Sequence, residues 1–72
     1  MFRECVNSIK YANNIVVIRT LIGSANTAAA MVDTIDQEGI LGTVAGDDTI
    51  IIVTTSNEEA INLSERLNNL LN

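Results

Sequence analysis

The stretch Ile40-Leu-Gly-Thr-Val-Ala-Gly-Asp-Asp-Thr-Ile-Ile51 decides the fold of this 72-residue chain. It predicts two apolar strands, Ile40 to Val44 and Thr49 to Thr54, joined by a tight turn, because glycine adopts positive φ at little cost and aspartate tolerates turn conformations. A turn that only has to connect two strands usually contains Asn-Gly or Asp-Gly. Here two adjacent carboxylates, Asp47 and Asp48, stand at the tip. The sequence therefore predicts a β-hairpin with concentrated negative charge at its end.

A second hairpin and a helix are predicted before this stretch. Cys5 to Lys10 and Ile15 to Thr20 are expected to be antiparallel strands with an Asn-rich turn between them. Ser24 is a suitable N-cap for a helix that continues to about Ile35. The side of that helix that packs on the sheet is expected to carry small side chains: Ala25, Ala28, Ala29, Val32 and Ile35.

The C-terminal segment predicts an ordinary sheet-packing helix. Ser56 and Glu59 have the spacing of a capping box. The apolar stripe that follows is expected to consist of Ala60, Leu63, Leu67, Leu70 and Leu71.

The predicted order is strand, strand, helix, strand, strand, helix, which favours an α+β fold with a four-stranded antiparallel sheet and two helices on one face. The run Ile50 to Val53 does not alternate in polarity, so we expect both faces of that strand to be buried. Two helices on one face leave the other face without cover. A partner chain is the expected cover.

Composition supports self-association of one domain that spans residues 1–72. A chain of this length buries only roughly 60% of its unfolded surface, and neither a disulfide nor a structural metal is favoured by one cysteine, Cys5, and no histidine. Hydrophobic residues make up 47% of the chain, more aliphatic surface than one small core needs. We therefore expect the excess to form a subunit interface.

Charge and hydropathy exclude several classes of partner. The net charge of −5 opposes binding to phosphate backbones, so the chain by itself is not expected to bind DNA. The sequence holds no apolar run of the length of a membrane span and no signal peptide. A cytoplasmic protein without membrane contact is expected.

Three interpretations of Asp47 and Asp48 stay open from the residues alone. Acidic residues at a hairpin tip are often solvated turn residues. Adjacent carboxylates with Thr49 also offer oxygen ligands to a divalent metal, although no second acidic cluster completes the set. Paired carboxylates further suit a guanidinium or ammonium ligand, and a planar guanidinium, which donates two parallel, charge-assisted hydrogen bonds to a carboxylate, fits them better than a point charge. Arginine is the natural candidate for that third ligand class.

An enzyme is not expected. Two carboxylates can share acid and base chemistry when their environments differ. However, the chain has no histidine, no activated serine or cysteine arrangement and no phosphate-binding glycine loop. The glycines from 39 to 46 are expected to serve the backbone.

Two stretches together, Arg19-Thr-Leu-Ile-Gly-Ser-Ala-Asn26 and Ile40 to Ile51, resemble in order and spacing the C-terminal domain of bacterial arginine repressors, and the similarity extends along the chain. The resemblance implies that three domains form a trimer, that two trimers stack into a hexamer, and that L-arginine binds as co-repressor at the contact between trimers, with no other cofactor. Asp47 and Asp48 match the family's acidic pair, which holds the charged groups of the ligand. Asp33 matches a further acidic position that contacts the ligand.

The same resemblance implies four more positions around the ligand. Thr43 and Ala45 lie on the strand whose backbone faces the ligand in relatives, and Ala25 and Asn26 begin the helix beside the site. Relatives commonly have Gln or His in place of Asn26, and often Pro in place of Ile22.

Full-length members of that family carry an N-terminal winged helix-turn-helix domain, which has no counterpart in this sequence. Either a fragment of a longer protein or a naturally short protein is expected, and the fragment is favoured. The resemblance implies a sensing and assembly domain of an arginine-dependent transcriptional regulator of arginine metabolism. The alternative is a purely structural trimerisation module with a degenerate ligand site.

Overall fold

A computed structural model describes residues 2–34 and 38–71 of the chain. The elements that it contains are, in chain order, α1 (Phe2–Cys5), β1 (Val6–Ala12), β2 (Ile15–Thr20), α2 (Ala25–Val32), β3 (Ile40–Ala45), β4 (Thr49–Thr54) and α3 (Asn57–Leu71).

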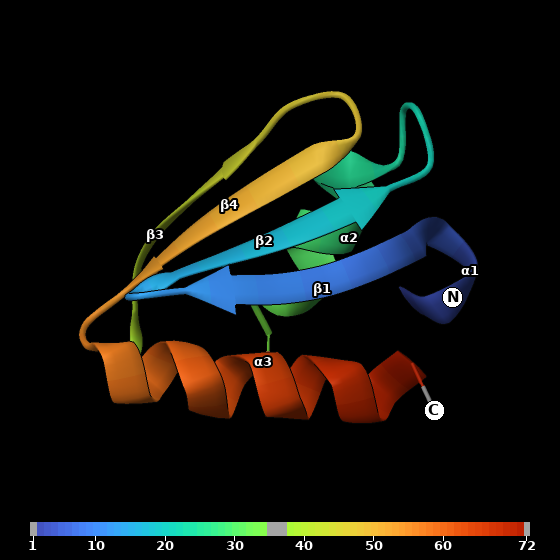
Figure 1. The fold of residues 1–72 in the computed structure, drawn as a ribbon. Coiled ribbons are helices and arrows are strands. Elements are labelled where there is room, and N and C mark those ends of the chain that lie inside the picture. The colour runs from blue at the N-terminus through green and yellow to red at the C-terminus, as the bar shows by residue number, and fades with distance from the viewer. Residues whose placement is uncertain (1, 35–37, 72) are drawn as a thin grey trace.

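The four strands form one antiparallel sheet in the order β1-β2-β4-β3 (Figure 1). Each hairpin contributes one central strand, and the two central strands pair with Ile18 opposite Ile50 and Arg19 opposite Thr49. Because β2 and β4 run antiparallel, the turn between β1 and β2 lies at one end of the sheet. The turn between β3 and β4 lies at the other.

One face of the sheet carries the core, and both long helices pack on it. The completely buried strand residues Val16, Ile18, Ile50 and Ile52 belong to the same cluster as residues of α2 and α3. The helix members of that cluster are Ala25, Ala28, Val32, Ala60, Leu63 and Leu67. Complete burial of one large aliphatic side chain stabilises the fold by about 1.5–3 kcal/mol. The predicted α+β class, strand order along the chain and placement of two helices on one face are confirmed.

The predicted cap of α3 is confirmed, whereas its predicted apolar stripe is wrong at one position. The Glu59 backbone N–H donates to Ser56 Oγ at 3.1 Å. Leu70, predicted in the stripe, is 49% exposed. At about 100° of rotation per residue, Leu70 lies some 80° from Ala60 around the helix, at the margin of the buried arc, whereas Leu67 lies near its centre.

The N-terminal segment differs from the prediction of a strand from Cys5 to Lys10. A short helix, α1, occupies residues 2–5, and β1 begins at Val6 and continues to Ala12. The Leu21 N–H donates to the Cys5 carbonyl at 2.8 Å, outside the sheet ladder, so the chain turns there before the strand begins. α2 begins after Ser24 as predicted. Its predicted end at Ile35 lies outside the described residues.

The prediction that both faces of β4 are buried is wrong for the single chain. Ile50 and Ile52 are completely buried, but Ile51 between them is 42% exposed, because the described part of the chain places no element over that face. We call this surface the open sheet face; the cross-strand pairing assigns to it Lys10, Ile15, Val17, Arg19, Val44 and Ile51.

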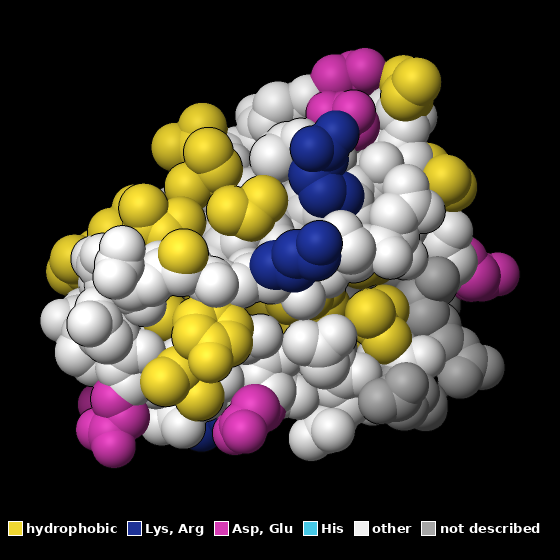
Figure 2. Space-filling view, viewed as in Figure 1, with side chains coloured by type: hydrophobic (Ala, Val, Ile, Leu, Met, Phe, Trp, Pro, Cys, Tyr) yellow, Lys and Arg dark blue, Asp and Glu magenta, His cyan; other side chains and the backbone are white. Residues whose placement is uncertain are grey.

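The open sheet face is partly apolar and partly basic. Figure 2 shows hydrophobic side chains gathered over β3 and β4, with Lys and Arg side chains beside them. A shallow depression of about 450 Å³ includes Lys10, Tyr11, Ile15, Val17 and Arg19 in its lining. None of the helices in the described ranges is long and apolar enough to cross a bilayer.

Candidate functional site

The acidic turn, residues 46–48 between β3 and β4, is held in place by its backbone. The Gly46 N–H donates to the Thr49 carbonyl at 2.8 Å, which closes the turn. The Asp48 carbonyl accepts from Thr20 N–H at 2.7 Å, and the Asp47 carbonyl accepts from Gly23 N–H at 2.9 Å. The turn is therefore fixed against the segment that joins β2 to α2, and its side chains are not needed to hold it there.

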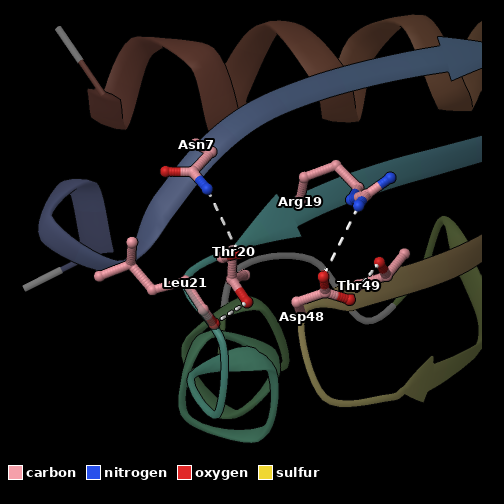
Figure 3. A network of polar contacts seen from close by, with 6 residues as sticks. All are labelled: Asn7, Arg19, Thr20, Leu21, Asp48 and Thr49. Carbon is pink, nitrogen blue, oxygen red and sulfur yellow. Dashed lines mark hydrogen bonds and ion pairs between the residues drawn. The ribbon is translucent and has the colours of Figure 1, made fainter.

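The two carboxylates of the turn have different surroundings, and Figure 3 shows those of Asp48. Thr49 Oγ1 donates to Asp48 Oδ1 at 3.0 Å, and Arg19 Nη2 lies 3.6 Å from Asp48 Oδ2. Both oxygens of Asp48 thus have a partner in the same chain. The Asp47 side chain is exposed and has no hydrogen bond or ion pair with the residues that the structure describes. Asp47 is consequently the carboxylate open to a ligand.

The first turn of α2 lies beside the acidic turn. The Ala25 N–H reaches the Asp47 carbonyl at 3.4 Å, and Ala25 itself is completely buried. Asn26 follows it and is exposed. The structure therefore brings four of the predicted positions together at one end of the molecule: Ala25, Asn26, Asp47 and Asp48.

Asp33 lies apart from this group in the single chain. It is the C-cap of α2, with its N–H donating to the Ala29 carbonyl at 3.0 Å. Since a helix rises about 1.5 Å per residue, the eight positions from Ala25 to Asp33 span about 12 Å along the axis. Asp33 and the acidic turn thus lie at opposite ends of α2.

Thr43 and Ala45 lie on β3, an outer strand of the sheet. They pair with Ile52 and Ile50, whose side chains are completely buried, so Thr43 and Ala45 point to the helix-covered face and are half-buried. An outer strand leaves a row of backbone N–H and C=O groups without sheet partners. Backbone contact with a ligand is therefore sterically open along β3.

The contact between Arg19 and Asp48 was not predicted from the sequence. The pairing of β2 with β4 places Arg19 opposite Thr49, the residue that follows Asp48. The signal that could have found it is this register. Because Arg19 is paired with Thr49, its side chain is only one ladder position from Asp48 and can reach that carboxylate.

The geometry offers no alternative metal centre among residues 2–34 and 38–71. No group of three or more Cys, Asp or Glu side chains in these ranges is close enough together to hold a metal ion. The acidic turn presents one open carboxylate and one paired carboxylate. That arrangement suits a cationic organic ligand better than a hard divalent ion, which takes six or more oxygen ligands when it is Ca²⁺.

The sequence is similar to a family of regulators. The family model described as "Arginine repressor, C-terminal domain" matches residues 2–69. A protein named arginine repressor from Alkaliphilus metalliredigens is 40% identical over 70 residues, which cover 97% of this chain and 47% of the relative. The arginine repressor of Clostridium acetobutylicum is 40% identical over 72 residues, which cover 100% of this chain and 48% of the relative. That of Alkaliphilus oremlandii is 44% identical over 71 residues, which cover 99% of this chain and 48% of the relative.

The chain thus spans about half the length of these curated relatives, and they are named as repressors and not as enzymes. The family match covers all four strands, α2, and α3 as far as Asn69. It also includes the acidic turn and the first turn of α2. With fold, turn geometry and similarity in agreement, the chain belongs to the arginine repressor C-terminal domain family.

Proposed function

We propose that this chain is the ligand-sensing and oligomerisation domain of an arginine-dependent transcriptional regulator of arginine metabolism, and that it binds L-arginine as co-repressor. The observation that carries the proposal is the acidic turn, with its backbone anchored and the Asp47 carboxylate open. Membership of the arginine repressor family supports the choice of ligand. DNA binding belongs to a separate domain of the longer protein, and the chain works in the cytoplasm.

The chemistry of the turn suits the two ends of arginine. A guanidinium is planar and donates two parallel hydrogen bonds to a carboxylate, and such charge-assisted bonds are about twice as strong as neutral ones. The α-ammonium group is a second cation that a neighbouring carboxylate attracts. A ligand of this kind neutralises the negative charge concentrated at the hairpin tip.

Assembly completes the proposed site. Within one chain Asp33 lies about 12 Å along α2 from the residues beside the acidic turn. A second copy of the chain is what brings an Asp33 to an acidic turn, at the interface between two trimers. The apolar residues of the open sheet face, with Val44 68% and Ile51 42% exposed, provide further surface for contact within a trimer.

Binding and assembly are thereby linked. Stacking of two trimers brings acidic turns to one interface, where like charges repel. Arginine relieves that repulsion. Because it binds the stacked form preferentially, it stabilises the hexamer by mass action.

Calorimetric titration of the chain with L-arginine, and with citrulline as its neutral isostere, tests the proposal. Saturable heat with arginine and none with citrulline is expected. Equilibrium sedimentation at several arginine concentrations should show a shift from trimer to hexamer. The absence of binding heat with arginine would contradict arginine sensing. An oligomeric state that does not change when arginine binds would contradict the link between binding and assembly.

A structural trimerisation module is the second candidate. The observation that favours it is the open sheet face, whose exposed apolar side chains need cover whether or not a ligand is present. A stable trimer that produces no heat with arginine would support this candidate.

A further inference from the structure

Asp47 and Asp48 of the acidic turn have the same side chain, but the contacts of the two residues differ. Three contacts converge on Asp48: the Thr20 N–H on its carbonyl at 2.7 Å, the Thr49 hydroxyl on Oδ1 at 3.0 Å and the Arg19 guanidinium 3.6 Å from Oδ2. Two of these contacts come from consecutive residues of β2. Asp47 has its carbonyl bonded but its side chain free of the described residues.

From this asymmetry we propose that Arg19 is a positioning residue of the ligand site: it orients Asp48 and offsets its charge, so that the Asp47 carboxylate stays free for the ligand. This inference deepens the proposed function and rests on it for the identity of the ligand. Arg19 acts through Asp48 and has no contact of its own with the ligand.

Orientation is the first part of that role. An unrestrained aspartate side chain samples several χ1 rotamers. The Thr49 hydroxyl and the Arg19 guanidinium hold the two oxygens of Asp48 from different sides, as Figure 3 shows. A carboxylate already fixed before the ligand arrives loses less conformational entropy on binding.

Charge compensation is the second part. Like charges on adjacent residues repel each other. The Arg19 guanidinium lies at Asp48, so it reduces the negative charge that Asp47 experiences. Lys10 and Arg19 line the same shallow depression, but the side chain of Lys10 makes no hydrogen bond or ion pair with the described residues. The compensation is therefore specific to Arg19.

Because the ion pair between Arg19 and Asp48 is exposed, the positioning role of Arg19 can be tested without a large change in fold stability. The side chains of Arg19 and Asp48 are 58% and 42% exposed. Exposed ion pairs contribute little to folding, because solvent screens them. Replacement of Arg19 is thus expected to leave the fold intact while it changes the site.

The test compares Arg19→Gln with two reference variants by calorimetric titration with L-arginine. Arg19→Gln is expected to weaken binding two- to fivefold, the factor to which roughly 0.4–1 kcal/mol of exposed ion-pair coupling converts. Arg19→Lys should restore part of the loss, since it keeps the charge without the planar fork. Lys10→Gln changes the net charge equally on the same sheet face, and its affinity should equal that of the parent chain.

A double-mutant cycle locates the effect. If Arg19 acts through Asp48, Arg19→Gln adds no further loss to Asp48→Asn. Additive losses would overturn the proposal. So would an equal effect of Lys10→Gln, or tighter arginine binding by Arg19→Gln, which would mean that Arg19 competes with the ligand for Asp48.

An NMR measurement without ligand keeps this test distinct from that of the proposed function. The Hα–Hβ couplings of Asp48 should indicate one dominant χ1 rotamer in the parent chain and averaging in Arg19→Gln. Failure of the parent chain to bind arginine would overturn the proposed function alone. Averaged couplings in the parent chain would overturn the positioning role alone.

Discussion

The two hairpin turns of the molecule lie at opposite ends of the sheet and differ in how much their anchoring depends on side chains. At the turn of residues 13–14, the asparagine turn, the Thr54 N–H donates to the Asn14 carbonyl at 2.9 Å. Two side-chain bonds reinforce it: Thr54 Oγ1 donates to the Asn14 carbonyl at 2.8 Å, and Asn14 Nδ2 donates to the Thr54 carbonyl at 3.3 Å. At the acidic turn, the bonds to the segment that joins β2 to α2 are all accepted by the backbone carbonyls of Asp47 and Asp48, and the Asp47 side chain stays free of the described residues.

This difference indicates how a small domain separates stability from recognition. A turn that is anchored by its backbone alone tolerates changes of side chain, because no anchoring bond is lost. A turn that is also anchored through side chains loses bonds when those side chains change. We therefore expect substitutions at the acidic turn to change affinity and substitutions at the asparagine turn to change stability.

The largest expected effect is on ligand binding at the acidic turn. Asp47→Asn should weaken arginine binding by about 1.5–3 kcal/mol, the usual contribution of a hydrogen bond to a charged group. Calorimetric titration measures the affinity, and thermal unfolding followed by circular dichroism should show an unchanged fold. Glu58→Gln, which makes the same charge change on exposed α3, is the control. Unchanged affinity in Asp47→Asn would favour the solvated-turn interpretation.

The next effect is on stability at the asparagine turn. Thr54 is 1% exposed, and its hydroxyl lies 2.8 Å from both the Asn14 and the Ser56 carbonyls. Thr54→Val should lower the free energy of unfolding by about 1–2 kcal/mol and leave arginine affinity unchanged. Urea unfolding at one fixed protein concentration measures it. Thr55→Val, at the exposed neighbouring position, is the control. An equal loss of unfolding free energy in that variant would contradict the role given to the Thr54 hydroxyl.

The smallest effect comes from backbone conformation at the same turn. Asn13 has a φ of 54°, in the left-handed region. Asn13→Ala should destabilise the fold by about 1 kcal/mol, because a Cβ without a local hydrogen-bonding group is disfavoured there. Asn13→Gly should be close to neutral in the same urea experiment. If both variants lose equal stability, φ is not the cause; if either changes arginine affinity, the separation of the two turns is wrong.

Much of the fold was predictable because its signals are local. The exact bounds of β2 and β4 follow from β-branched runs, and the start of α3 follows from the Ser56 and Glu59 cap. The short helix α1 was missed, because four residues without a cap or periodicity carry no such signal. The exposed face of β4 was missed for a different reason. An apolar run indicates that a surface will be covered, but not whether the same chain covers it.

The residues of the candidate site stay a prediction from the sequence, and their geometry could be predicted only in part. Asp47 and Asp48 stand out as an unusual turn composition, and the start of α2 beside them follows from the order of the motifs. The separation of Asp33 from them depends on the direction of α2 relative to the sheet. The pairing of Arg19 with Asp48 depends on strand register. Both are tertiary features that no local pattern encodes.

Tyr11 gives one end of β1 an optical property. The chain has one tyrosine and no tryptophan, and that tyrosine is 48% exposed on an outer strand. It pairs with the buried Val16, so its side chain lies on the opposite side of the sheet from the open sheet face. Emission from this single phenol ring will report whether a second subunit covers the end of β1 beside the asparagine turn, without a dye or an engineered label.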